Sequence, residues 1–343
     1  MKTPSPNIDA VITWVDGNDE QHRRSMQEVI ARTGALQTHE VRTSRDPTRF
    51  LDNGELFYCI RSIRKFAPWI RTIFLVTADQ TPPFLTHEER QRLGVTMVGH
   101  REIFAPYEHH LPTFNSRSIE TALWRIPGLA PRFLYFNDDF VLTAPVSPGD
   151  FFTDDGVVIH GKWNAMTRYG PIRLKLNGIA TRLSKRLLGI TRSMNLLLQI
   201  RSARLAGHTG RYFRTTHIPH AVRTETLRAW FDTRPDVLEE NIAYQFRSEK
   251  QFSGIFLAHH LEIAAGKAEL RDTGGYVMIN GENDFGFILR RKLSRIAAGR
   301  TRFACLHALE RFSASRLDAI RRTFDRLVSR ESTGSGESGL PLK

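Results

Sequence analysis

The sequence predicts an α/β fold with a mostly parallel, Rossmann-like sheet, interrupted by a basic helical insertion. Short β-rich runs alternate along the chain with segments whose apolar residues recur at helical spacing, as in the strand–helix units of parallel sheets. One run, residues 133–136, is apolar throughout, as expected for a strand buried on both faces. Polar residues follow several of these runs, where α/β proteins bind their ligands.

The individual elements are predicted from apolar spacing and from the residues that cap or end each segment. Residues 55–66 read as a helix because their apolar residues recur at three- and four-residue steps, and Pro68 ends the segment. Ser116 is a candidate cap for the helix that follows it. Strands are expected at 8–15, 73–76, 95–98, 133–136, 157–159, 276–280 and 303–306, and helices at about 19–31, 55–66, 88–93, 116–124, up to 231, 251–265 and from 313 onward.

Bulk composition predicts a globular protein. The chain has 343 residues, of which 41% are hydrophobic and 25% are charged, so we expect a single α/β domain over 1–330 and a disordered tail at 331–343. Cys59 and Cys305 each stand alone in an apolar setting, which argues against a disulfide framework or a zinc site. No apolar signal region and no run of ~18 apolar residues is visible, so we expect a cytoplasmic protein.

The net charge of +13 is concentrated in one segment. No Asp or Glu occurs between Gly156 and Thr224, a span that holds thirteen Lys and Arg residues. Apolar residues from 179 to 198 recur at helical steps between these cations, so the insertion at 160–215 is predicted to dock on an anionic acceptor or on the inner face of the cell membrane. The alternative is a core-packing helix pair with a solvated basic face. Nucleic acid is not an expected partner, because aromatic residues are sparse there.

Asn137, Asp138 and Asp139 directly follow the buried run at 133–136. Adjacent carboxylates at the end of a buried strand require a counter-charge or a metal ion. We therefore interpret Asp138 and Asp139 as ligands of Mg²⁺ or Mn²⁺ that face a phosphorylated substrate. The structural alternative is a strand that ends in a polar turn, where Asn and Asp are common.

Three further segments contain candidate residues for the same site. Asp16, followed by Gly17, ends the first strand, where an α/β nucleotide site is built, although an aspartate before glycine is also typical of a turn. His217 and His220 flank Pro219, which argues against a helical metal pair and leaves a general base, metal ligands or surface residues as alternatives. Arg247 is a candidate phosphate clamp, because a guanidinium binds phosphate oxygens in a bidentate manner.

Taken in order, these motifs resemble the Stealth family of sugar-1-phosphate transferases. This family includes bacterial capsular and exopolysaccharide enzymes and is related to the animal N-acetylglucosamine-1-phosphotransferase α/β subunit. The resemblance rests on IDAVITWVDG at 8–17, RFLDNGELFYCIRSI at 49–63, APWIR at 67–71, LPTFNS at 111–116, NDD at 137–139, HIPH at 217–220, FRS at 246–248, GE at 281–282 and the segment 302–306. Each fragment is short, and their shared order makes the resemblance specific.

The resemblance implies a phosphoryl transfer in capsule or exopolysaccharide synthesis. An acceptor hydroxyl on a free or lipid-linked glycan would attack the phosphorus next to the sugar of a UDP-sugar, giving a phosphodiester and UMP. Mg²⁺ or Mn²⁺ would bind Asp139 together with Asp138, and His217 would take the hydroxyl proton. Arg247 and Arg61 would hold phosphate oxygens. The other positions that it carries over are Asp16, Gly17, Asn115 and Glu282 near the donor, with His220, Arg49, Glu55 and Asp284 as secondary candidates. Of these, Asn115 and Glu55 are expected to orient the site and not to react.

One block departs from the family pattern, and two other functions stay open. The usual Cys-Leu-Asn-Asp reads Cys-Leu-His-Ala here, so a carboxylate is missing at Ala308, which Glu282 or Asp284 would have to replace. The main rival function is a metal-dependent glycosyltransferase of the A-type fold, which would release UDP. The non-enzymatic alternative is a module that binds a membrane or a polyanion through its basic span.

Overall fold

The computed structural model describes residues 7–34, 45, 50, 52–166 and 193–329. A five-stranded sheet forms its centre, in the order β3-β2-β1-β4-β8. The first four strands are parallel and β8 is antiparallel to β4, which confirms the predicted α/β fold with a mostly parallel sheet. The strands are β1 (Ile8–Thr13), β2 (Ile73–Thr77), β3 (Val95–Gly99), β4 (Arg132–Asn137) and β8 (His220–Arg223).

Helices cover both faces of this sheet. Successive residues of a strand point to opposite faces, so Ile12 and Phe136 pack on one side while Val11 and Tyr135 pack on the other. The first face is covered by α2 (Glu55–Phe66), whose buried apolar residues have the predicted spacing. The second face is covered by α4 (His100–Phe104), α5 (Ser116–Ala122), α8 (Thr224–Asp232) and α10 (Gly254–Ala264).

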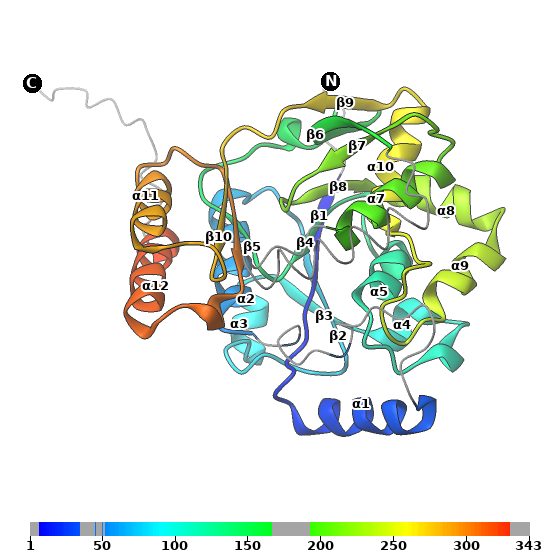
Figure 1. Ribbon diagram of the computed structural model, residues 1–343, viewed down its shortest axis with the longest axis horizontal. Helices are drawn as coiled ribbons and strands as arrows, with labels where there is room; N and C mark the ends of the chain where they lie inside the picture. The colour runs from blue at the N-terminus through cyan, green and yellow to red at the C-terminus, as the bar shows by residue number, and fades with distance from the viewer. Residues whose placement is uncertain (1–6, 35–44, 46–49, 51, 167–192, 330–343) are drawn as a thin grey trace, which may run out of the picture.

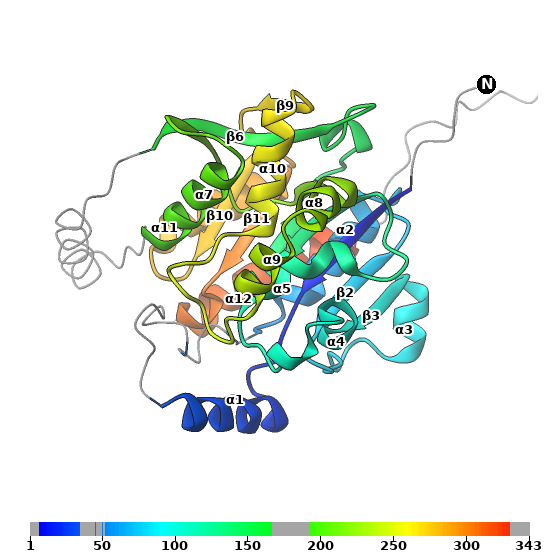
Figure 2. The same ribbon diagram turned by 90° about the vertical axis from the view of Figure 1, so that its right-hand side faces the viewer.

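Two three-stranded sheets flank the central one. One has the order β10-β11-β5, formed by β10 (Tyr276–Asn280), β11 (Phe303–His307) and β5 (Phe140–Leu142), and the other has the order β7-β6-β9, formed by β7 (Arg211–Thr215), β6 (Val157–Ala165) and β9 (Ala268–Arg271). Helices α11 (Gly286–Ala297) and α12 (Ala314–Ser329) stand at one side of the molecule, opposite α8 and α9 (Pro235–Ile242), as Figure 1 shows. The helix α1 (Glu20–Thr33) lies apart from the central sheet in both views (Figures 1 and 2), and α3 (His87–Arg92) and α7 (Ser193–Leu205) complete the α-helices of the described residues.

The basic insertion is only partly described, and its described part is not all helical. Strands β6 and β7 form its two ends and pair with each other, and α7 packs against β7 and α10. On α7, Leu198 and Ile200 are buried, so this part is a core-packing helix, which was the alternative to a docking segment. Most of the predicted amphipathic run at 179–198, like the tail at 331–343, lies outside the described residues. Where the structure describes the chain, none of its helices has both the length and the apolarity needed to span a bilayer.

Candidate functional site

A cavity of about 170 Å³ opens at the carboxyl ends of β1 and β4. This is the edge of a parallel sheet where α/β proteins bind ligands. Asp138 lines it from the end of β4, and Ser116 and Arg247 line it from α5 and from the loop before α10. The other lining residues are Thr13, Trp14, Val15, His22, Phe50, Val76, His100, Thr113, Phe114, Ile119, Glu120 and Asn137. A carboxylate and a guanidinium therefore share one cavity.

Hydrogen bonds with Ser116 and Asn115 hold Arg247 and the loop that carries it at the cavity. Its Nη2 donates to the Ser116 hydroxyl at 2.6 Å. The buried Asn115 fixes the loop before it, because the Asn115 Nδ2 donates to the carbonyls of Tyr244 and Phe246 at 2.9 and 3.1 Å. The same Nδ2 lies 2.9 Å from the Gln251 Oε1. The Asn115 side chain is thus engaged in positioning the loop that carries Arg247.

Asp138 and Asp139 form a tight turn that leads from β4 in the central sheet to β5 in a flanking sheet. The turn given as the structural alternative is therefore present, and its two carboxylates are half-buried. Burial together with the neighbouring charges of Asp139 and Asp52 raises the pKa of Asp138 well above its ordinary value. Burial also raises the pKa of Asp139.

The two carboxylates of the turn face different neighbours. Asp138 lines the cavity. Asp139 Oδ2 lies 3.2 Å from the Cys305 sulfur of β11, and the positive potentials of His217 and His307 act on the same carboxylate.

These residues fit a divalent cation such as Mg²⁺ or Mn²⁺. Asp139 Oδ1 is buried and has no hydrogen-bond partner, although buried polar atoms are almost always satisfied. The charges of Asp139 and Asp52 both repel an ionised Asp138, which contributes to its raised pKa. Oxygen ligands with an excess of negative charge are the donor set that hard cations prefer.

Glu55 supports this carboxylate group from the first turn of α2. Burial, followed by a hydrogen bond with Asp52, raises the pKa of Glu55 to about 9, and the charge of Asp138 acts in the same direction. A protonated Glu55 can hold Asp52, whose Oδ2 also accepts from the Trp14 indole at 2.8 Å. This placement agrees with the orienting role expected for Glu55.

His217 lies near Asp139, and the charges of the two residues act on each other. It is half-buried, and its ring packs edge-on against Phe140 with centroids 6.2 Å apart. Burial lowers the pKa of His217, while the charge of Asp139 opposes that shift and the charges of His307 and Arg214 add to it. A neutral imidazole at neutral pH can accept a proton.

Asp16 and Gly17 shape the entrance to α1. Asp16 Oδ1 accepts from the Asn18 backbone at 2.8 Å, which is the turn geometry given as the alternative, and the charge of Asp16 acts on the cavity residue His22. Gly17 donates its N–H to the Phe50 carbonyl at 2.6 Å. A Cβ at Gly17 would lie 2.3 Å from the Phe50 Cβ, so only glycine permits this close approach.

Four predicted residues do not line the cavity. Arg61 stacks on Phe57 at 4.5 Å and faces Glu89 of α3 at 3.5 Å, so it is not a cavity residue. His220 is buried as the first residue of β8 instead of lying in a loop. Glu282 is exposed in the turn after β10. Asp284 is buried and forms an ion pair with Lys292 at 2.5 Å. Arg49 lies outside the described residues.

Sequence reasoning missed Glu120, His22 and His100, which all line the cavity. Burial raises the pKa of Glu120 to about 7 and lowers the pKa of His100 to about 4. Glu120 lies four residues after Ser116, within α5. An acidic residue in a short helix gives no signal of its own before the packing is known.

Comparison with known proteins gives the family. Residues 6–34 match Stealth protein conserved region 1 and residues 49–160 match conserved region 2. Receptor polysaccharide phosphotransferase WefC of Streptococcus oralis is 30% identical over 305 residues, which is 82% of this chain and 86% of that protein. The chain therefore belongs to the Stealth family, a family of transferases.

Other relatives are longer than this chain. The capsular polysaccharide phosphotransferase of Neisseria meningitidis serogroup B is 39% identical over 158 residues, which is 45% of this chain and 40% of that protein. An exopolysaccharide phosphotransferase of Streptomyces coelicolor is 34% identical over 247 residues, 72% of this chain and 41% of that protein. The chain thus spans about two fifths of the length of these relatives.

Among solved structures, the chain resembles the bifunctional glycosyltransferase WbbM and the galactosyltransferase LgtC. For WbbM the identity is 11% and the TM-score 0.39, over 96% of this chain and 50% of that one. For LgtC the identity is 11% and the TM-score 0.37, over 82% of this chain and 94% of that one. Likeness at this level does not bear on function.

Proposed function

We propose that this protein transfers a sugar-1-phosphate from a UDP-sugar to a hydroxyl of a glycan acceptor, with release of UMP, in the synthesis of a capsule or exopolysaccharide. The observation that carries the proposal is the cavity that Asp138 and Arg247 share. Phosphoryl transfer needs charge neutralisation and in-line positioning more than covalent catalysis. The relatives named above are phosphotransferases, which supports the same class of reaction.

The donor would bind with its phosphates between Arg247 and the turn at Asp138. The guanidinium would hold non-bridging oxygens, and Ser116 keeps it aimed at the cavity. The cavity is smaller than the roughly 300–1,000 Å³ of typical ligand sites, so it would take only part of a nucleotide sugar. Asp138 and Asp139 would hold Mg²⁺ or Mn²⁺, which when bound neutralises the charge of a diphosphate.

The acceptor would approach from the side of His217. Its hydroxyl oxygen forms the new bond to phosphorus as the bond from phosphorus to the UMP oxygen breaks, and His217 receives the hydroxyl proton. In-line displacement places the entering and leaving oxygens on opposite sides of phosphorus, so the proposal puts the acceptor hydroxyl near His217 and the donor phosphates near Arg247. Arg214 of β7, which acts on His217, would attract an anionic or lipid-linked acceptor toward this side.

The nucleotide product distinguishes this proposal from its main rival. The protein would be incubated with a panel of UDP-sugars, Mg²⁺ and an acceptor glycan, and the products followed by chromatography and phosphorus NMR. UMP together with a phosphodiester signal is the expected result. UDP without a phosphodiester would reject phosphotransfer in favour of a glycosyltransferase.

The His217→Ala variant tests the assigned base. We expect turnover to fall by about 10²–10⁴-fold, the usual contribution of general base catalysis, while binding of the UDP-sugar is retained. The Arg61→Ala variant is the matched control, because Arg61 belongs to the same family motif set but faces Glu89. Turnover of His217→Ala close to wild type would remove His217 from this role.

A further inference from the structure

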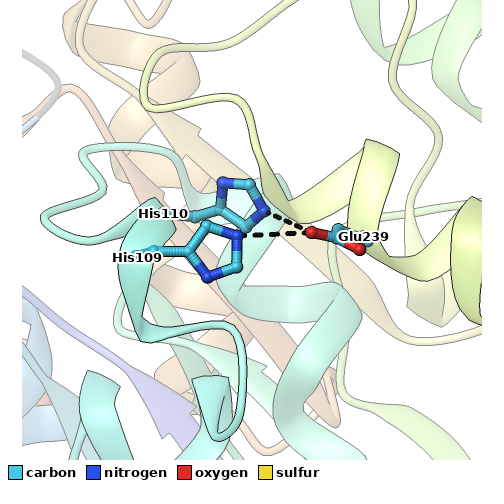
Figure 3. A group of neighbouring side chains, drawn as sticks. All are labelled: His109, His110 and Glu239. Atoms are coloured by element: carbon cyan, nitrogen blue, oxygen red, sulfur yellow. Dashed lines mark hydrogen bonds and ion pairs between the residues drawn. The ribbon is translucent and has the colours of Figure 1, made fainter.

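The most distinctive cluster of possible metal ligands outside the proposed active site is formed by His109, His110 and Glu239. The histidines belong to a short 3₁₀ helix at Glu108–His110, and the glutamate belongs to α9. One ligand atom from each residue lies within 4.8 Å of the others, and no other group of three His, Cys, Asp or Glu in the described part of the chain meets this condition. Figure 3 shows both imidazoles directed at the same carboxylate oxygen.

The distances in this cluster match the edges of a tetrahedral metal site. Zinc binds imidazole nitrogen and carboxylate oxygen at about 2.0–2.1 Å, so two tetrahedral ligands lie about 3.3 Å apart. The Nε2 atoms of His109 and His110 lie 3.3 and 3.2 Å from the Glu239 Oε1. Both separations are at or beyond the long end of N–H···O hydrogen bonds, which are most often about 2.9–3.0 Å.

We propose that His109, His110 and Glu239 form a binding site for Zn²⁺ or a related transition-metal ion. Two imidazole nitrogens and one carboxylate oxygen suit zinc, whereas Mg²⁺ and Ca²⁺ prefer oxygen ligands alone. The side chains are accessible, with exposed fractions of 61% for His109 and 44% for Glu239, and the more buried His110 is at 19%. Three protein ligands leave the fourth position to water or to a further ligand.

A metal ion at this site would link two segments of the chain, each of which continues to a residue that lines the cavity. Ser116 follows His110 by six positions, and Arg247 follows Glu239 by eight. Between them the segments are already paired, because the Phe114 N–H donates to the Gln245 carbonyl at 2.9 Å. A bound metal would add a link at the outer end of this pairing and make it harder to separate the two segments.

Co²⁺ absorption tests the site directly, since tetrahedral Co²⁺ gives strong visible bands. Metal-depleted protein in the Asp139→Asn background, which removes the other carboxylate site, would be titrated with Co²⁺ and then with Zn²⁺. We expect a single tetrahedral Co²⁺ signal that Zn²⁺ displaces. No signal, or an octahedral spectrum alone, would overturn the proposal.

Matched variants assign the ligands. In His109→Ala, His110→Ala and Glu239→Gln the Zn²⁺ affinity should fall by more than the roughly 10–100-fold typical of losing an outer-shell partner. Two control variants should retain wild-type affinity for Zn²⁺. Glu240→Gln changes the exposed neighbour of Glu239, and His87→Ala removes a different exposed histidine. Zn²⁺ should raise the Tm of the parent protein and not that of Glu239→Gln. Unchanged affinity in Glu239→Gln and His109→Ala would refute the assignment, and circular dichroism spectra would confirm that each variant is folded.

Discussion

The buried carboxyl of Glu120 should make the protein less stable as the pH rises from about 4.5 to 7. Burial raises the pKa of Glu120 from 4.5 to about 7, against the opposing effects of Ser253 and Arg117. Over this interval the unfolded chain has lost the proton while the folded protein keeps it, so the free energy of unfolding falls with pH. Each pH unit contributes about 1.4 kcal/mol, and 2.5 units give about 3 kcal/mol.

Replacing Glu120 with glutamine removes this dependence and leaves the shape of the side chain nearly unchanged. Ser253 Oγ, which donates to the Glu120 Oε2 at 3.1 Å, can still find an acceptor. Urea denaturation followed by tryptophan fluorescence would give the free energy of unfolding of both proteins from pH 4.5 to pH 8. The difference, Glu120→Gln minus wild type, should increase by about 3 kcal/mol up to pH 7 and then level off. A difference that stays constant over this range would refute the argument.

Three further predictions concern residues whose roles the structure separates. Asn115→Ala should lower the free energy of unfolding by about 3 kcal/mol in urea denaturation. The two N–H bonds of its Nδ2 are shared among the Tyr244, Phe246 and Gln251 oxygens, and its Oδ1 accepts from the Arg117 N–H, so about three hydrogen bonds are lost at roughly 1 kcal/mol each. A change within error would contradict the anchoring role. Arg247→Ala should reduce kcat by about 10²–10³-fold in the UMP-release assay, whereas an equal loss in Arg61→Ala would show that the cavity does not define the site. Asp284→Asn should destabilise the protein by about 2 kcal/mol, and a double-mutant cycle with Lys292→Met should assign that loss to the ion pair and not to metal binding.

The four parallel strands of the central sheet could be predicted because their apolar runs carry the information locally. The run at 133–136 and the helix at 55–66 were both confirmed, and so was the position of Asp138 and Asp139 at the end of a strand. The strands β5, β7, β8 and β9 were missed. They have three to five residues each, and their pairing depends on partners far away in the sequence.

The candidate site was harder to predict, because its members come together only through packing. Arg61 and Arg247 look alike in the sequence, yet only Arg247 lines the cavity, since Asn115 fastens its loop to α5. His220 was expected in a loop, but it pairs with Tyr135 of β4 and is therefore part of the sheet. Glu120 gave no signal because its raised pKa arises from burial, which depends on the tertiary structure.

The pairing of β6 with β7 has a consequence for how this protein could diversify. The two antiparallel strands pair from Gly161 with Thr215 to Ala165 with Arg211, so the two ends of the segment between them lie side by side. The entropic cost of closing such a segment rises by only about 0.6 kcal/mol for each doubling of its length. Sequence and length can therefore change beyond this strand pair while the turn at Asp138 and the backbone at His217 keep their positions. One framework would in this way accommodate different acceptors through the exchange of a single segment.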